Sequence, residues 1–237
     1  MALIYAVKLV DEYDRAVFKQ ALENLPVDVR NKAARYRKEA DAVREIVSAV
    51  LKRIVACQVN GIGLHRVEFL RDGYGKPSLK EFPDFHFNVS HSHAWVVCAV
   101  SAEGPVGIDI EMIGKAEEGV ARMCLTPKEL HEWFGQPKDQ RDTYFLKLWT
   151  LKESYVKATG KGLAENLSSL ETIKEGESFR MARQGLVDTD RSLRMVSFDP
   201  AYQMAICTAV QDIPINRVDM SMNELMLGFI GLQSGSR

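Results

Sequence analysis

The order of helix-forming and strand-forming segments repeats along this chain, and the repeat constrains the fold more than any other feature. A long helical segment ends in NGIGL at residues 60–64, and a second ends in TGKGL at 159–163. Apolar strands follow each of them, and WVVCAV at 95–100 is similar to MAICTAV at 204–210. This repeated order predicts two similar α+β lobes with a ligand cleft between them. The alternative is a chance similarity between short apolar strings.

The two lobes are expected to meet near Gly104, so that residues 1–104 form an N-terminal lobe and residues 105–237 a C-terminal lobe. The 237 residues suffice for two small lobes. The chain has 31 basic and 32 acidic residues and a net charge of -1. This balance argues against a general nucleic-acid coat or a polybasic membrane protein.

The apolar runs and the cysteine spacing indicate whether the protein is in a membrane and in which redox compartment it lies. No apolar run is long enough to span a membrane, and the apolar residues 2–10 are expected to form a first strand instead of a signal peptide. The 4 cysteines show no CxxC spacing, which argues against a zinc ribbon or a redox pair. We therefore expect a reduced, cytoplasmic protein.

Two acidic residues alternate in the segment GIDIE at residues 107–111. On a strand, Asp109 and Glu111 point to the same side, while Ile108 and Ile110 point into the core. Two neighbouring carboxylates repel each other unless a cation lies between them, and oxygen ligands of this kind suit Mg²⁺. The alternative is a solvated strand end with two surface acids.

A second group of functional candidates lies on the helical segment 146–163. Trp149, Glu153 and Lys157 are spaced by four and share one helix face. A carboxylate set into a largely apolar helix is costly, so Glu153 is a candidate third metal ligand or general base, and Lys157 a candidate phosphate ligand. A simple ion pair between Glu153 and Lys157 explains the same spacing.

Small polar residues follow a strand pattern in FHFNVSHSHAW at residues 85–95. Ser90 and His91 suit phosphate oxygens, whereas His91 with His93 suits a His-x-His metal site, and a plain polar turn is the third possibility. Lys76 lies in a rigid loop, GKP. Neither a P-loop nor a GxGxxG motif is present, so the residues indicate a metal-assisted reaction on a phosphate compound held without those loops.

Four motifs together resemble those of the 4'-phosphopantetheinyl transferases of the larger, pseudo-dimeric type, which activate nonribosomal peptide and polyketide synthases. They are GKP at 75–77, FNVSHS at 87–92, GIDIE at 107–111 and WTLKESYVKATGKGL at 149–163. The resemblance implies two α+β lobes related by a pseudo-two-fold axis, with coenzyme A in the cleft. It also implies transfer of the phosphopantetheine arm to a serine of an acyl or peptidyl carrier protein, with release of adenosine 3',5'-bisphosphate.

The resemblance also implies roles for individual residues. The expected Mg²⁺ ligands are Asp109, Glu111 and Glu153, and Glu153 is also the expected base for the carrier serine. Lys157 is expected to contact the phosphates. Expected coenzyme A contacts are Arg44, Lys76, Ser90, His91 and Asp109, with His91 on the 3'-phosphate and Lys76 near the adenine; Lys32 and Arg37 are looser matches.

The chain departs from the family pattern at His93, and its tail after Asp212 follows no motif, so Phe229 and Ile230 are expected either in the core or at a partner. The carrier is expected near the helices that begin at Ala116 and Thr126, on Met123, Leu125 and Leu130. Two joined lobes already build one cleft, so a monomer is expected, with no nucleic-acid or membrane partner.

Two other functions remain open at this stage. One is a metal-dependent phosphohydrolase that uses His91, His93, Asp109 and Glu111, in which the histidines bind zinc or manganese. The other is a coenzyme A binding module without catalysis, which would tolerate the loss of Glu153.

Overall fold

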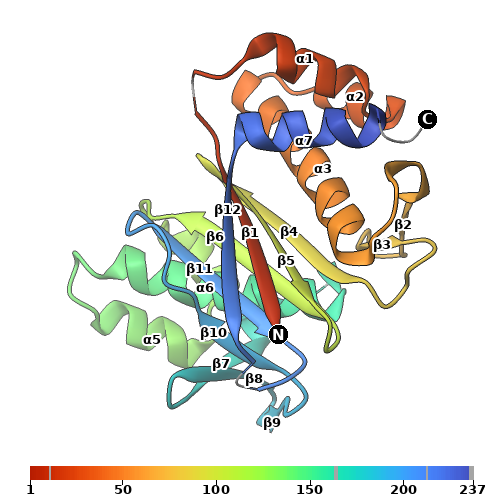
Figure 1. Cartoon of the computed structure of the whole chain (residues 1–237). Helices are drawn as coiled ribbons and strands as arrows, with labels where there is room; N and C mark the ends of the chain where they lie inside the picture. Colours follow the sequence, from red (N-terminus) through yellow and green to blue (C-terminus); the bar gives the residue numbers. More distant parts are fainter. Residues whose placement is uncertain (11, 163–164, 212, 235–237) are drawn as a thin grey trace.

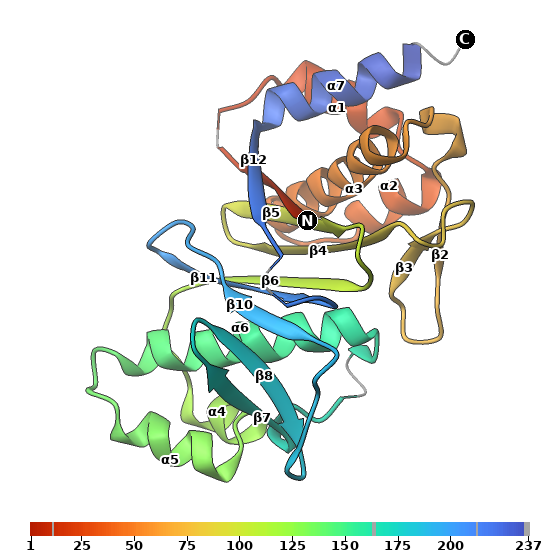
Figure 2. The same ribbon diagram turned by 60° about the horizontal axis from the view of Figure 1, so that its bottom comes forward.

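Two β-sheets lie face to face at the centre of the molecule, and helices cover both outer faces (Figure 1, Figure 2). The computed structural model describes residues 1–10, 12–162, 165–211 and 213–234. Leu163, the last residue of the second glycine motif, and Asp212, where the tail begins, lie outside the described residues. In the described part, no helix is both long and apolar enough to cross a membrane.

The first sheet has the order β12-β1-β5-β4, with β12 parallel to β1 and the other pairs antiparallel. Its strands are β1 (Ala2–Lys8), β4 (His86–Ser92), β5 (Trp95–Ser101) and β12 (Ile215–Ser221). Its helices are α1 (Arg15–Glu23), α2 (Val27–Ala33), α3 (Glu39–Asn60) and α7 (Met222–Ser234). A short ribbon of β2 (Phe69–Arg71) and β3 (Pro77–Leu79), preceded by η1 (Leu64–Arg66), lies beside this layer.

The second sheet has the order β6-β11-β10-β8-β7, and β9 pairs with β8. Its strands are β6 (Val106–Met112), β7 (Leu170–Glu175), β8 (Ser178–Arg183), β9 (Leu186–Val187), β10 (Ser192–Met195) and β11 (Tyr202–Thr208). The helices of this lobe are α4 (Glu118–Cys124), α5 (Pro127–Gly135), α6 (Arg141–Thr159) and the short η3 (Leu167–Ser169).

Strand alternation gives each sheet two apolar faces. On β1, Tyr5 and Val7 join the core under the helices, whereas Ile4 and Ala6 join the core between the sheets. On β6, Ile108 and Ile110 point into the core between the sheets, as the sequence predicts. The two lobes therefore share a hydrophobic core, which fixes how they lie relative to each other.

Gly107 lets helix α6 lie directly on β6. A Cβ atom at this position would lie 2.0 Å from the backbone oxygen of Ser154 and 2.5 Å from the nitrogen of Ala158. Any larger residue would push the helix away from the strand. Gly107 thus allows α6, which carries Glu153 and Lys157, to lie against β6, which carries Asp109.

Both long helices end as predicted, at glycines in the left-handed conformation. Gly61 has φ 62° and Gly160 has φ 76°. The sequence TPKE at 126–129 predicts a capping box, and Thr126 and Glu129 form it at the start of α5. The residue pattern of 27–59 predicts one continuous helix, but this prediction is wrong: α2 and α3 are separate, and the exposed, mostly charged residues 34–38 join them.

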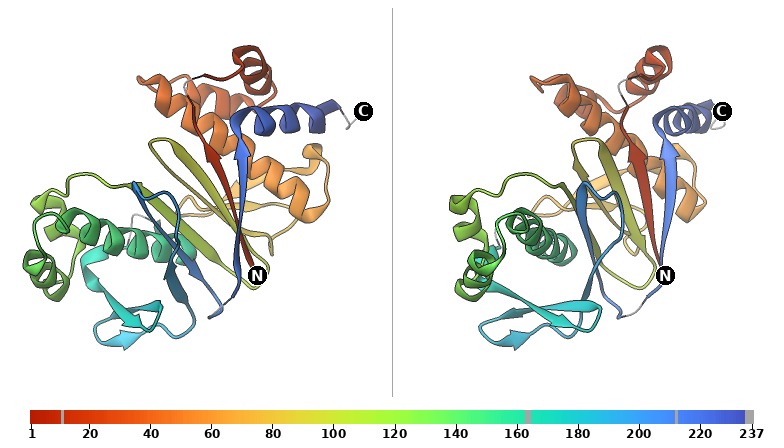
Figure 3. Two further views of the ribbon diagram at one scale, coloured as in Figure 1. Left: turned by 60° about the vertical axis from the view of Figure 1, so that its left-hand side comes forward. Right: turned by 90° about the vertical axis from the view of Figure 1, so that its left-hand side faces the viewer.

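The C-terminal segment packs on the first lobe. The first lobe therefore includes residues beyond the expected range 1–104. Strand β12 pairs with β1 along its whole length, and α7 packs on α1 and α3. Figure 3 shows β12 beside β1 in both views. Phe229 is buried in the core of the first lobe, and Ile230 packs against that core. The tail thus supplies core side chains to the lobe in which the chain begins.

Candidate functional site

A row of side chains on β4 joins the two sheets next to the predicted acids. Asn88 Oδ1 accepts a hydrogen bond from the backbone N–H of Ile108 at 2.9 Å. Ser90 Oγ donates to Asp109 Oδ1 at 3.0 Å, and Ser92 Oγ donates to Glu111 Oε2 at 2.8 Å. These three β4 residues alternate along FNVSHS, so strand geometry points them to the same side.

Asp109 is the centre of this arrangement. Its side chain is 4% exposed, and Oδ1 accepts hydrogen bonds from Lys157 Nζ at 2.6 Å and from Ser90 Oγ. Lys157 Nζ also lies 3.0 Å from Ser90 Oγ. Burial raises the pKa of Asp109, although Lys157 and Ser90 oppose that shift. The other oxygen, Oδ2, is buried and has no hydrogen-bond partner among the described residues, so this carboxylate has capacity for one more ligand.

Glu111 and Glu153 share the electrostatic environment of Asp109. Burial raises the pKa of Glu111, and the charge of Asp109 raises it further. The pKa of Glu153 is raised by the same two causes, in the same order. Among the described residues, no three His, Cys, Asp or Glu side chains are already gathered as metal ligands. The three carboxylates are close enough to repel one another, and Lys157 supplies compensating charge.

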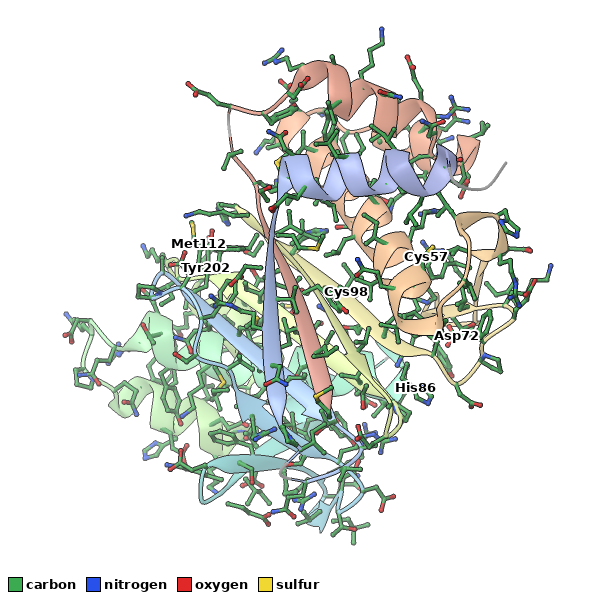
Figure 4. All side chains as sticks on the ribbon, in the orientation of Figure 1. Cys57, Asp72, His86, Cys98, Met112 and Tyr202 are labelled. Carbon is green, nitrogen blue, oxygen red and sulfur yellow. The ribbon has the colours of Figure 1, made fainter. Side chains whose placement is uncertain are left out.

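Lys76 lies at one end of the junction between the lobes. Its Nζ donates to the backbone oxygen of Ala158 near the end of α6 at 2.9 Å, and burial lowers its pKa. Asp72 Oδ1 accepts the backbone N–H of Lys76 at 2.9 Å, which fixes the loop. A small cavity of about 110 Å³ lies here between Lys76, His86 and Pro105. In Figure 4, Asp72 and His86 mark this end of the junction, and Met112 and Tyr202 mark the other.

Arg44 and His91 belong to the helix side of β4. Arg44 Nη1 donates to the backbone oxygen of His93 at 2.8 Å, and its guanidinium also contacts Asp41. Burial lowers the pKa of His91, and the positive charges of Arg44 and Lys157 lower it further. His91 alternates with Ser90 and Ser92, so its side chain faces α3 instead of the acids.

The two histidines do not form the alternative His-x-His metal site. His93 lies in the turn after β4 with φ 45°, a left-handed backbone, so it does not continue the strand alternation from His91. The phosphohydrolase alternative is therefore not supported.

Sequence reasoning missed the roles of Asn88 and Ser92, whose bonds to β6 hold the acids in place. The alternation in FNVSHS contained that signal. It also missed Lys152, whose buried Nζ donates to Glu129 Oε2 at 2.5 Å. The prediction that Leu125 contacts the carrier is wrong, because this side chain is only 2% exposed. Met123, predicted for the same surface, is 74% exposed.

Comparisons with known proteins cover both lobes. The model of the 4'-phosphopantetheinyl transferase superfamily matches residues 105–207, and that of the 4'-phosphopantetheinyl transferase N-terminal region matches residues 13–103. The chain is 35% identical to 4'-phosphopantetheinyl transferase psf-1 of Bacillus pumilus, over 86% of this chain and 89% of the relative. It is 33% identical to 4'-phosphopantetheinyl transferase Sfp of Bacillus subtilis (strain 168), over 83% and 88%. It is 29% identical to 4'-phosphopantetheinyl transferase ffp of Bacillus subtilis, over 94% and 99%.

Proposed function

Because the chain belongs to the 4'-phosphopantetheinyl transferase family, we propose that it moves the 4'-phosphopantetheine arm of coenzyme A onto a serine of an apo carrier protein. In this reaction the serine oxygen bonds to the phosphorus of the arm. The pyrophosphate P–O bond breaks, and adenosine 3',5'-bisphosphate leaves. The observation that supports this chemistry best is Asp109, a buried carboxylate held by Lys157 and Ser90 between two further acids.

The acids fit a magnesium ion by their chemistry. Asp109 has a buried oxygen without a hydrogen-bond partner among the described residues, and its charge raises the pKa values of Glu111 and Glu153. A cation among the three would relieve their repulsion. We propose Asp109, Glu111 and Glu153 as its ligands. When bound, Mg²⁺ supplies positive charge that offsets the charge building on the leaving phosphate.

Two side chains of α6 are proposed to act on the reacting groups. Glu153 is proposed as the base that removes the serine proton. Burial and the charge of Asp109 raise the pKa of its carboxyl in the chain by itself, and a bound cation would lower it again. Lys157 is anchored by Asp109 and Ser90, so its ammonium is already oriented and can stabilise negative charge on the phosphates without reorganising.

Coenzyme A is proposed to bind along the junction, with its adenine end toward Lys76 and its 3'-phosphate at His91. Ser90 contributes to the phosphate site, and Arg44 lies beside His91 and His93. The nearby charges of Arg44 and Lys157 make this region attractive to an anion.

We predict that His91→Ala weakens binding of coenzyme A at least several-fold more than binding of 3'-dephospho-coenzyme A, because only the first carries the phosphate that His91 contacts. Titration calorimetry with both compounds measures the two affinities. Equal weakening of both would place the 3'-phosphate elsewhere.

The carrier protein is proposed to dock on α4 and α5. Val120, Met123 and Phe134 are large apolar side chains exposed on these helices. Arg122 lies over the Phe134 ring at 5.5 Å but is paired with Glu118 at 2.6 Å. Arg141 lies over the same ring at 5.9 Å and donates to backbone oxygens, so it adds positive charge to this surface. Carrier helices are acidic, so basic groups here favour the encounter.

We also propose that the protein works as a cytoplasmic monomer; its four cysteines are buried free thiols, as expected in a reducing compartment.

Intact-mass spectrometry tests the function directly. We expect an apo carrier protein incubated with this protein, coenzyme A and Mg²⁺ to gain one phosphopantetheine arm, and EDTA to abolish the gain. Bound coenzyme A with no gain on any of several carriers would instead indicate a binding module. Degraded coenzyme A with no gain would indicate a hydrolase.

A further inference from the structure

A carboxylate lies inside the basic region where the proposed function puts the 3'-phosphate. Glu45 of α3 is only 15% exposed, and its Oε2 accepts a hydrogen bond from Lys32 Nζ of α2 at 2.7 Å. The hydroxyl of Tyr36 lies 3.4 Å from the same oxygen. Lys32, one of the basic residues predicted near coenzyme A, is therefore already neutralised by a residue of the chain itself.

Glu45 is surrounded by more positive than negative groups. It directly follows Arg44, which donates to the turn after β4 and also pairs with Asp41. Two helical turns on, Lys52 Nζ lies 5.0 Å from the centre of the Phe69 ring, and no carboxylate among the described residues is paired with it. Burial lowers the pKa of Lys52 to about 8, the charges of Arg53 and Arg71 lower it further, and the charge of Glu45 opposes this shift. Lys52 is thus a largely buried cation without a carboxylate partner in the described part of the chain, and a nearby anion would stabilise it.

Glu45 and Lys52 lie on one face of α3, the helix that packs on β4. Glu45, Ser48 and Lys52 are three and four residues apart and so share a helix face. The Ser48 Oγ atom is buried and has no hydrogen-bond partner in the described part of the chain. Helix α3 packs on β4, and the charge of Glu45 acts on His91. A polar atom without a partner, between a buried carboxylate and an unpaired lysine, fits a site that receives a polar ligand.

We propose that Glu45 is a specificity-determining residue: its carboxylate competes with the 3'-phosphate of coenzyme A for Lys32 and the cations around His91. This inference rests on the proposed function. Two effects act together. The carboxylate repels the phosphate, with little screening because it is mostly buried, and it keeps Lys32 engaged. The chain therefore discriminates less strongly between coenzyme A and 3'-dephospho-coenzyme A than its cations alone would allow.

The test is Glu45→Gln, which keeps the shape and the hydrogen-bond acceptor for Lys32 but removes the charge. We expect the Kd for coenzyme A to fall about tenfold, while the Kd for 3'-dephospho-coenzyme A stays unchanged. Glu68→Gln is the matched control, since Glu68 pairs with Lys80 at 2.8 Å on the surface, and it should change neither affinity. Titration calorimetry with both compounds measures all three proteins.

The outcomes separate this inference from the proposed function. Equal changes for the two compounds, or weaker binding of coenzyme A by Glu45→Gln, would overturn the inference and assign Glu45 to holding Lys32 in place. An unmodified protein that binds neither compound and modifies no carrier would overturn the proposed function, and this inference with it.

Discussion

Replacing Asp109 with asparagine should reduce phosphopantetheine transfer by about a thousandfold or more while the fold survives. Asp109 contacts Lys157 and Ser90 and also acts on the pKa values of Glu111 and Glu153. Asparagine keeps the oxygen that accepts from Ser90 but removes the charge. The metal would then lose a ligand, and Lys157 would lose the anion that orients it. Initial rates of holo-carrier formation, followed by intact mass, measure the effect.

The fold is expected to survive because the burial of Asp109 already disfavours its charged form. Burial raises the pKa of Asp109, so a neutral isostere is tolerated at this position. Lys157 loses its partner, but its side chain is 26% exposed and keeps access to water, unlike a fully buried cation. A thermal melt of the variant, and its binding of Mn²⁺ followed by electron paramagnetic resonance, separate a lost metal ligand from a lost fold. We expect a near-normal melting temperature and weakened Mn²⁺ binding.

Asp219→Asn is the matched control. Asp219 lies on the edge strand β12 and pairs with Arg217 at 3.0 Å in solvent, so the same chemical change should leave transfer unaffected. Normal turnover by Asp109→Asn would remove Asp109 from the proposed metal ligands. Equal losses in both variants would point to a general effect of removing acidic charge instead of a specific role of the site.

Local sequence patterns predicted on which face of a strand a side chain lies and where a helix ends. The alternation in GIDIE put Ile108 and Ile110 in the core and Asp109 on the opposite side, and both placements are confirmed. The glycines after α3 and α6 predicted where those helices end. Such predictions succeed because strand alternation and helix termination depend on neighbouring residues only.

Contacts between distant segments were not predictable in the same way. The hydroxyl of Ser92 donates to Glu111 because β4 and β6 lie side by side. Local sequence patterns do not predict that two strands of different sheets come together. The tail showed no motif, yet β12 joins β1 at the other end of the chain. Leu125 looked available for docking because its local pattern does not reveal the helix core that buries it.

Lys152 is another residue whose role depends on distant segments, and its replacement should give the largest loss of stability. Its side chain is 0% exposed, and its three donors are all used: Nζ donates to Glu129 Oε2, to the backbone oxygen of Cys124 at 2.8 Å and to that of Leu167 at 3.1 Å. One ammonium group thereby joins α6 to α4, to α5 and to η3, next to Glu153.

Lys152→Met fills a similar volume but leaves the Glu129 carboxylate, which is 3% exposed, buried without a cation. Two backbone oxygens lose their partner as well. Removing one member of a buried ion pair typically costs about 3–5 kcal/mol. We expect urea unfolding to show a loss of free energy of unfolding of that size. Glu129→Gln added to Lys152→Met should recover part of it, because the amide carries no charge and can still accept from Thr172 N–H.

Lys128→Met is the comparison that isolates burial as the cause. Lys128 also pairs with a glutamate, at 2.6 Å from Glu171 Oε1, but its side chain is 67% exposed. An exposed pair contributes only about 0–1 kcal/mol, so this variant should remain close to the unmodified protein. If the two lysine variants lost equal stability, burial would not be the reason that Lys152 matters. The helices of the proposed docking surface would then be held to α6 by their apolar contacts instead of by this ion pair.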